Sequence, residues 1–291
     1  MQKKPLILNF APTGLVAGRE QSPHVPLSPE EIITEVRSAV ATGITVVHLH
    51  ARDSRNLSTS DPEMYARIIG GIREFAPELV ICVSLTGRRV GNLEERCAPL
   101  KLTGDVKPDM ASLTLSSLNF SREASVNAPD TVLEIARRLL DCGVLPELEI
   151  FDLGMTQAMR YLIHKGLLHP PYYANLVMGG PFIAQASLLH LSALVSSLPP
   201  DTHWSAGGIG GAQLPANGLA IASGGGVRVG LEDNLCYDHD SRQLATNSAL
   251  LNRVHQLASL HERPVMTPVE FRALFNLQPG GGSFGCHQKI P

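Results

Sequence analysis

The chain has 291 residues, of which 44% are hydrophobic and 18% are charged. These proportions are typical of a globular protein with a large core, and they exclude a disordered chain, which would combine few hydrophobic residues with many charges. Lys and Arg number 24 against 27 Asp and Glu, so the net charge is −3. A general nucleic-acid binder would need a basic surface, and we therefore expect no nucleic-acid partner.

No segment of the sequence predicts export or membrane insertion. The apolar run near the N-terminus is short and meets Pro12 without a clean cleavage site. No stretch reaches the roughly 18 apolar residues that span a bilayer. The five cysteines are scattered and form no CxxC pair, which favours structural thiols in a reducing compartment. We expect a cytoplasmic protein with no membrane partner.

Short apolar runs rich in β-forming residues alternate with longer segments of helical spacing. Near-continuous apolar strands that alternate with helices indicate a parallel sheet covered on both faces. Eight such units predict an α/β protein, a single-domain (β/α)8 TIM barrel over residues 1–278, with an open doubly wound sheet as the alternative. The expected strands cover 6–11, 44–50, 79–84, 110–114, 145–151, 173–178, 202–206 and 227–230.

Two stretches mark the ends of predicted elements. Ser28 followed by Pro29 and Glu31 predicts a capped helix start, and Gly43 predicts the end of the same helix. Residues 279–291 begin with a glycine-rich run, so we expect a C-terminal tail that is flexible or contacts a partner. Barrels of this kind often assemble, and we expect a homo-oligomer.

The sequence around His48 and His50 is the most informative segment. Residues i and i+2 of a strand point to the same face, so both imidazoles project together at the carboxyl end of the second predicted strand. Chemistry in a barrel takes place at this end, and two imidazoles form half of a divalent metal site. The pair is equally compatible with histidines that bond to backbone or water. Arg52 and Asp53 follow, either to orient an imidazole or substrate or as a surface ion pair.

A third metal ligand is expected at the eighth predicted strand, where Arg228 precedes Glu232 and Asp233. Glu232 lies just beyond the strand, which neighbours strand one and comes close to strand two when a barrel closes. His48, His50 and Glu232 are therefore the predicted metal ligands. A solvated loop that caps a helix is the alternative for this charged cluster.

Other strand ends carry residues suited to anions. Gly207, Gly208, Gly210 and Gly211 follow strand seven, where backbone amides and a helix start would favour phosphate or carboxylate, although tight barrel turns need such glycines too. Ser84 ends strand three, and Arg88 and Arg89 come shortly after it. The two arginines would receive an acidic substrate or nucleotide phosphates, or would lie on a solvated face.

Glu147 and Glu149 share the spacing of a strand pair that faces inward. One of them would then reach the site, unless the pair forms salt bridges at the mouth of the barrel. The sequence alone does not choose between these roles.

The sequences NFAPTG at 9–14, HLHAR at 48–52 and VRVGLEDN at 227–234 together resemble the β-keto acid cleavage enzyme family, which includes the 3-keto-5-aminohexanoate cleavage enzymes. The resemblance runs from about residue 5 to about residue 270. It implies a zinc-dependent (β/α)8 barrel in which a β-keto acid and acetyl-CoA yield acetoacetate and a new acyl-CoA.

The resemblance also assigns residues. The Zn²⁺ ligands match His48, His50 and Glu232, the catalytic pair matches Asp233 and Arg228, and the serine that binds the substrate carboxylate matches Ser84. In the implied reaction Asp233 removes the C2 proton, zinc stabilises the enolate, CoA is transferred, and a retro-Claisen cleavage follows.

The match has two departures. Relatives with amino-substituted substrates resemble one another in a glutamate shortly after the first Thr-Gly, whereas Leu15 stands here, which favours an uncharged or acidic substituent. The strand-three loop reads SLTGRR, so Thr86 is a second choice for the carboxylate contact of Ser84. Arg88, Arg89 and the strand-seven glycines, Gly208 among them, are expected to help hold CoA phosphates or a second carboxylate.

Two other functions fit a barrel of this kind. A metal-dependent hydrolase is the main alternative, but it would usually add a Lys or His ligand on a middle strand. A catalytically silent barrel that binds a small molecule is the other.

Overall fold

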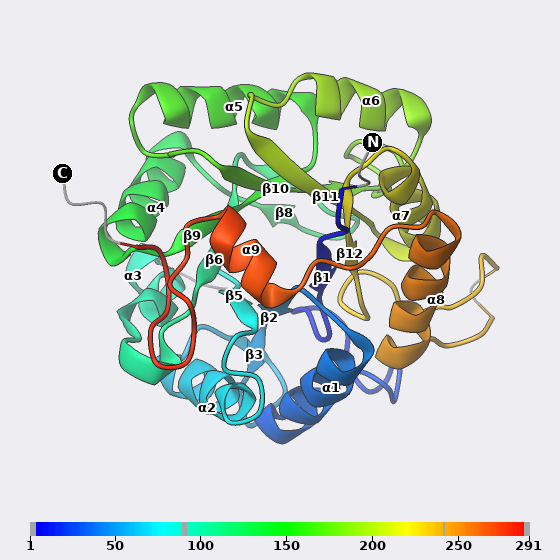
Figure 1. Cartoon of the computed structure of the whole chain (residues 1–291), viewed down its shortest axis with the longest axis horizontal. Coiled ribbons are helices and arrows are strands. Elements are labelled where there is room, and N and C mark those ends of the chain that lie inside the picture. The colour runs from blue at the N-terminus through cyan, green and yellow to red at the C-terminus, as the bar shows by residue number, and fades with distance from the viewer. Residues whose placement is uncertain (1–3, 89–91, 241, 288–291) are drawn as a thin grey trace.

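The computed structural model describes residues 4–88, 92–240 and 242–287. In this part of the chain eight parallel strands close into a barrel in the order β1-β12-β11-β10-β9-β6-β5-β2 (Figure 1). The (β/α)8 prediction is confirmed, and the open sheet is excluded because β1 pairs with both β2 and β12. The barrel strands are β1 (Leu8–Phe10), β2 (Val46–Leu49), β5 (Val80–Val83), β6 (Met110–Thr114), β9 (Leu145–Ile150), β10 (Tyr172–Met178), β11 (Thr202–Gly208) and β12 (Gly226–Val229).

Helices surround these strands in a ring, and two short hairpins lie outside the barrel sheet (Figure 1). The helices are α1 (Pro29–Thr42), α2 (Pro62–Arg73), α3 (Leu93–Arg96), α4 (Pro129–Cys142), α5 (Leu153–His164), α6 (Leu188–Ser196), α7 (Gln213–Ala222), α8 (Asn247–Leu260) and α9 (Pro268–Leu274). Short 3₁₀ turns cover Ala98–Lys101, Gly104–Val106 and Gly210–Ala212. The hairpins pair β3 (Ala51–Arg52) with β4 (Ser58–Thr59) and β7 (Leu118–Asn119) with β8 (Ala124–Ser125).

The cap predicted for the first helix is present. The Ser28 hydroxyl accepts from the Glu31 amide, and the Glu31 carboxylate accepts from the Ser28 amide, so each residue satisfies an otherwise unpaired donor. Pro29 occupies the first helical position, and Gly43 forms the C-terminal cap. The helix therefore begins and ends where the sequence predicts, and it delivers the chain directly to β2.

The N-terminal end of the barrel is filled with apolar side chains and covered by α9. Phe271 and Phe275 pack against Tyr173, which lies inside the barrel, with ring centroids 5.5 and 5.8 Å away. Figure 1 shows α9 lying across this opening. Because the N-terminal end is closed, the opposite end is where a ligand can reach the barrel interior.

The segment after residue 278 lies against this N-terminal end. The Gly285 amide donates to Asp109, the Cys286 amide donates to the Gly143 carbonyl, and Phe284 is buried beneath the Arg73 guanidinium. Residues 279–287 thus contact the barrel closely, and 288–291 are outside the described residues. The domain boundary at residue 278 stays a prediction.

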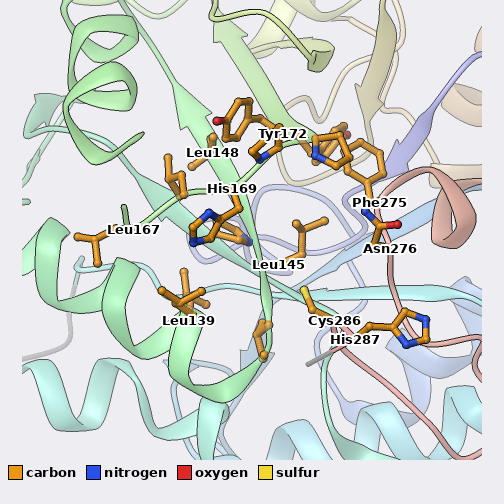
Figure 2. A pocket seen from close by; sticks show the side chains of 18 of the residues that line it. Leu139, Leu145, Leu148, Leu167, His169, Tyr172, Phe275, Asn276, Cys286 and His287 are labelled. Carbon is orange, nitrogen blue, oxygen red and sulfur yellow. The ribbon is translucent and has the colours of Figure 1, made fainter. Parts of the chain in front are cut away.

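A large hollow opens beside this covered end. Its volume is about 840 Å³, and it is lined mainly by apolar residues from α4, the start of β9 and β10, and the C-terminal segment (Figure 2). Leu139, Leu145 and Phe275 are among them, together with His169 and Cys286. None of the predicted site residues lines it.

Among the described residues all five cysteines are free thiols, as expected. In the same part of the chain, no helix combines the length and the apolar composition that crossing a membrane requires.

Candidate active site

The three predicted metal ligands meet at the C-terminal end of the barrel. His48 lies on β2 and His50 directly follows it, while Glu232 follows β12 after a turn at Gly230. Because β1 pairs with β2 on one side and β12 on the other, the two segments are brought together across it. His50 Nε2 lies 3.4 Å from His48 Nε2 and 3.1 Å from Glu232 Oε1, and His48 Nε2 lies 3.9 Å from Glu232 Oε1.

These residues fit a zinc ion. Two imidazoles and one carboxylate are a common donor set for catalytic zinc, with a further position left for substrate. A tetrahedron with bonds of about 2.1 Å has edges of about 3.4 Å, close to the three separations given above. In addition, Glu232 Oε2 is buried without a hydrogen-bond partner, an arrangement that is costly unless a ligand satisfies it. Burial lowers the pKa of His50 and so favours the neutral form that binds metals.

Arg228 holds both carboxylates of the site. Its Nε lies 2.9 Å from Asp233 Oδ2 and its Nη2 lies 2.6 Å from Glu232 Oε1. Burial opposes ionisation of Glu232, but Arg228 and the two imidazoles outweigh it and hold its pKa well below the usual range. Burial also raises the pKa of Asp233. Arg228 opposes this effect, but the pKa of Asp233 remains above its usual value. A carboxylate with a raised pKa is a stronger base.

A pocket of about 50 Å³ connects these groups with the predicted substrate contacts. Ser84, Thr86 and Arg88 line it together with His50, Arg228, Glu232 and Asp233. His48 lies behind His50 and is fully buried.

Gly208, the last residue of β11, does not line the pocket, whereas Ile209 does. A Cβ atom at Gly208 would come within 2.3 Å of the Ala212 carbonyl oxygen, so close backbone packing accounts for this glycine. Arg89 lies outside the described residues.

Arg52 and Asp53 differ from the expected orienting pair. The Arg52 guanidinium donates to the carbonyl oxygens of Gly14 and Ala17, at 2.6 and 3.0 Å. Asp53 pairs with the exposed Arg55. Arg52 thus fixes the loop after β1, which carries Leu15 into the pocket.

The loop after β1 lies directly against the metal ligands. Gly14 has a φ of +66°, and a Cβ atom there would lie 2.6 Å from Glu232 Cγ. Glycine is therefore required both by the backbone conformation and by the close approach of Glu232.

Both glutamates of β9 reach the barrel interior. Glu149 lines the pocket and accepts from the Thr114 hydroxyl at 2.6 Å. Glu147 is fully buried, and its Oε2 lies 2.5 Å from His48 Nδ1. Burial alone would raise the pKa of Glu147, but its interaction with His48 lowers the pKa to about 2. In the sequence, the position of Glu147 and Glu149 two residues apart in an otherwise apolar strand indicates that both face the barrel interior.

Comparison with known proteins identifies the family of this chain. The profile of the beta-keto acid cleavage enzyme family matches residues 5–277. The chain belongs to this family.

Two curated relatives of known activity cover nearly the whole chain. A 3-keto-5-aminohexanoate cleavage enzyme of Acetoanaerobium sticklandii is 35% identical over 94% of this chain and 98% of its own. A 3-oxoadipate:acetyl-CoA acetyltransferase of Cupriavidus necator is 34% identical over 94% of this chain and 95% of its own. The names of these two relatives refer to two different keto acids, 3-keto-5-aminohexanoate and 3-oxoadipate.

Solved structures agree on the fold. Apo ObcA superposes with a TM-score of 0.72 at 21% identity, over 87% of this chain and 66% of its own. The 3-dehydroquinate dehydratase of Geobacillus kaustophilus gives a TM-score of 0.53 at 11% identity, over 89% of this chain and 91% of its own.

Proposed function

We propose that this member of the family is a zinc-dependent β-keto acid cleavage enzyme, which converts a β-keto acid and acetyl-CoA into acetoacetate and a new acyl-CoA. The observation that carries the proposal is the convergence of His48, His50 and Glu232 beside the Arg228–Asp233 pair. The names of the curated relatives, which include a cleavage enzyme and an acetyl-CoA acetyltransferase, support the same reaction.

Each side chain has a defined part in this reaction. When bound by His48, His50 and Glu232, zinc would supply a Lewis acid for the keto group of the substrate and lower the free energy of its enolate. Asp233 takes the proton from C2, and Arg228 holds the carboxylate in place. The resulting C2 carbanion attacks the acetyl thioester and expels CoA as a thiolate, which then adds to the keto carbon. The bond between C2 and that carbon breaks, which gives the new acyl-CoA, and the released acetoacetate carbanion takes the proton back from Asp233.

The remaining pocket residues bind and orient the substrate. The Ser84 and Thr86 hydroxyls lie in the pocket lining and would receive the carboxylate of the β-keto acid. Leu15 and Phe151 supply apolar surface, and Arg88 supplies a positive charge. Leu15 and Arg88 support a substituent that is uncharged or acidic, and Glu149, which also lines the pocket, is held by the Thr114 hydroxyl.

A panel of β-keto acids with neutral, acidic and ammonium-bearing side chains tests the proposal. Each acid is incubated with acetyl-CoA and the zinc-loaded protein, and the new CoA thioester is detected by mass. We expect a new acyl-CoA and acetoacetate in equal amounts, and no product after chelation of the metal. Turnover of a keto acid without acetyl-CoA would instead support the metal-dependent hydrolase.

A further inference from the structure

His48 belongs to two possible metal-binding groups. One contains His48, His50 and Glu232 at the pocket, and the other contains His48, Cys82 and Glu147 deeper in the barrel. The two groups use different nitrogen atoms of the same imidazole, because Nε2 points to His50 and Nδ1 points to Glu147. The nitrogen of His48 that carries hydrogen therefore decides which group is able to bind an ion.

The hydrogen bond to Glu147 decides this. His48 Nδ1 lies 2.5 Å from Glu147 Oε2, and both side chains are fully buried, so two acceptors facing each other without a hydrogen between them would be strongly destabilised. Nδ1 accordingly carries the hydrogen and donates it. The lone pair of the neutral ring is then on Nε2, which points to His50 and the pocket.

Glu147 is itself held by residues from three other strands. Asn9 on β1 and Asn175 on β10 each donate to Oε1 from 2.6 Å, and the Cys82 thiol on β5 lies 3.4 Å from Oε2. Both oxygens are thus engaged, and rotation of the carboxylate would break at least two of these bonds. This network keeps the acceptor for His48 in one place.

The deeper group is poorly arranged for a catalytic ion. His48, Cys82 and Glu147 are all buried, none of the three lines the pocket, and their donor atoms already bond to one another. A metal there would displace these hydrogen bonds and would have no contact with a substrate.

We propose that Glu147 is a positioning residue, which holds His48 in the Nδ1–H form with Nε2 directed to the metal at the pocket. Orienting carboxylates of this kind commonly contribute about 10-fold to 100-fold to metal affinity. The inference rests on the proposed function only in requiring that the protein bind zinc, and the protonation of His48 is open to test without the metal.

Two variants separate the alternatives. Glu147→Gln keeps the size of the side chain but turns one oxygen into a donor, so it conflicts with His48 or with the two asparagines. Cys82→Ser is the matched control, because the hydroxyl still donates to Glu147 but is a poor ligand for zinc in place of a thiol. We expect zinc affinity, measured by competition with a chelator, to fall about 10-fold to 100-fold for Glu147→Gln and to change less than about twofold for Cys82→Ser.

The ring of His48 gives a second readout that does not depend on activity. In ¹⁵N-labelled protein at a pH where the ring is neutral, the wild-type apoprotein should show hydrogen on Nδ1 of His48, and Glu147→Gln should shift it toward Nε2. An Nε2–H form in the wild-type protein, or unchanged zinc affinity in a folded Glu147→Gln variant, would overturn the proposal. Equal loss of zinc in Cys82→Ser would place the ion at the deeper group and overturn it as well.

Melting curves by circular dichroism show whether each variant folds. If Glu147→Gln does not fold, the wild-type ring measurement still decides, and Glu147→Asp, which withdraws the carboxylate by one methylene, replaces it in the zinc titration. A wild-type protein that binds no zinc but has the Nδ1–H form would refute the proposed function and leave the role of Glu147 in orienting the ring intact.

Discussion

At the N-terminal end of the barrel, the buried carboxylate of Asp109 receives donors on both oxygens. Arg272 donates to each of them from 2.9 and 2.8 Å, and Arg73 donates to Oδ2 from 2.7 Å. At the C-terminal end, Glu232 uses one oxygen for Arg228 and His50, while its other oxygen is buried without a partner. Both ends bury charge, but both oxygens of the Asp109 carboxylate have donors, whereas Glu232 leaves one buried oxygen as an acceptor for a ligand.

The comparison teaches that the hydrogen bonding of the buried carboxylate distinguishes the structural cluster from the candidate binding site better than the size of the neighbouring cavity does. The hollow at the N-terminal end measures about 840 Å³ and the pocket at the C-terminal end about 50 Å³. Yet the charged groups of the candidate active site line the smaller one. Substitutions at the N-terminal end should therefore lower the free energy of unfolding more than the activity, whereas substitutions at the C-terminal end should lower the activity more than the free energy of unfolding.

The largest effect is expected from His48→Ala. Loss of one of three ligands should abolish stoichiometric zinc binding and reduce turnover by about a thousandfold or more, because the keto group then lacks its Lewis acid. Metal analysis and product detection measure both. His164→Ala, on the exposed end of α5, is the control and should retain zinc and activity. Retained zinc stoichiometry in His48→Ala would remove this residue from the ligand set.

Asp233→Asn should reduce turnover by about 10²-fold to 10⁴-fold and leave zinc bound, since it removes the base but no ligand. The direct measurement is exchange of the C2 hydrogen of the β-keto acid with deuterated solvent. Asp240→Asn, on the exposed part of the same loop, should exchange at the wild-type rate. Unchanged exchange in Asp233→Asn would show that another group removes the proton.

Asp109→Asn tests the other end of the barrel. Arg73 and Arg272 would remain buried without their negative partner, which should lower the free energy of unfolding by about 3–5 kcal/mol. Urea denaturation measures the loss, and zinc affinity of the folded fraction should stay unchanged. Asp105→Asn, at an exposed position nearby, should have little effect. A wild-type midpoint for Asp109→Asn would contradict the structural role of this cluster.

The smallest change is expected from Leu15→Glu. A carboxylate in the pocket should shift the ratio of kcat/KM toward an ammonium-bearing β-keto acid, relative to a neutral one, by about tenfold. Val16→Glu places the same charge on the exposed neighbour and should leave the ratio near the wild-type value. If both variants shifted it equally, the general field of the site, and not contact with Leu15, would be responsible.

Much of the fold could be predicted because its signals are local. Each barrel strand overlaps a predicted run, since strands covered on both faces are almost wholly apolar. His48 and His50 were found by their spacing on one strand, and Glu232 by its place beyond the last strand of a closed barrel. Closure itself brings the three together, so a correct topology was sufficient.

Contacts made between distant segments could not be predicted in the same way. Arg52 was expected either to orient an imidazole or a substrate or to form a surface ion pair, and it binds carbonyl oxygens of the loop after β1. Glu147 had two possible roles, and only the register of β2, β9 and β10 brings it to His48 and Asn175. Side-chain partners of this kind depend on three-dimensional packing, about which spacing along the chain carries no information.

The closure of the barrel by α9 also constrains how the proposed reaction can proceed. Since Phe271 and Phe275 close the N-terminal end, the described residues leave the C-terminal end as the route by which both reactants would enter and both products would leave. A small keto acid seated against the histidines would lie beneath the much larger thioester, so the acid has to arrive first and the coenzyme product has to depart before acetoacetate can escape. An ordered kinetic mechanism would then follow from the two phenylalanines that close the opposite end of the barrel.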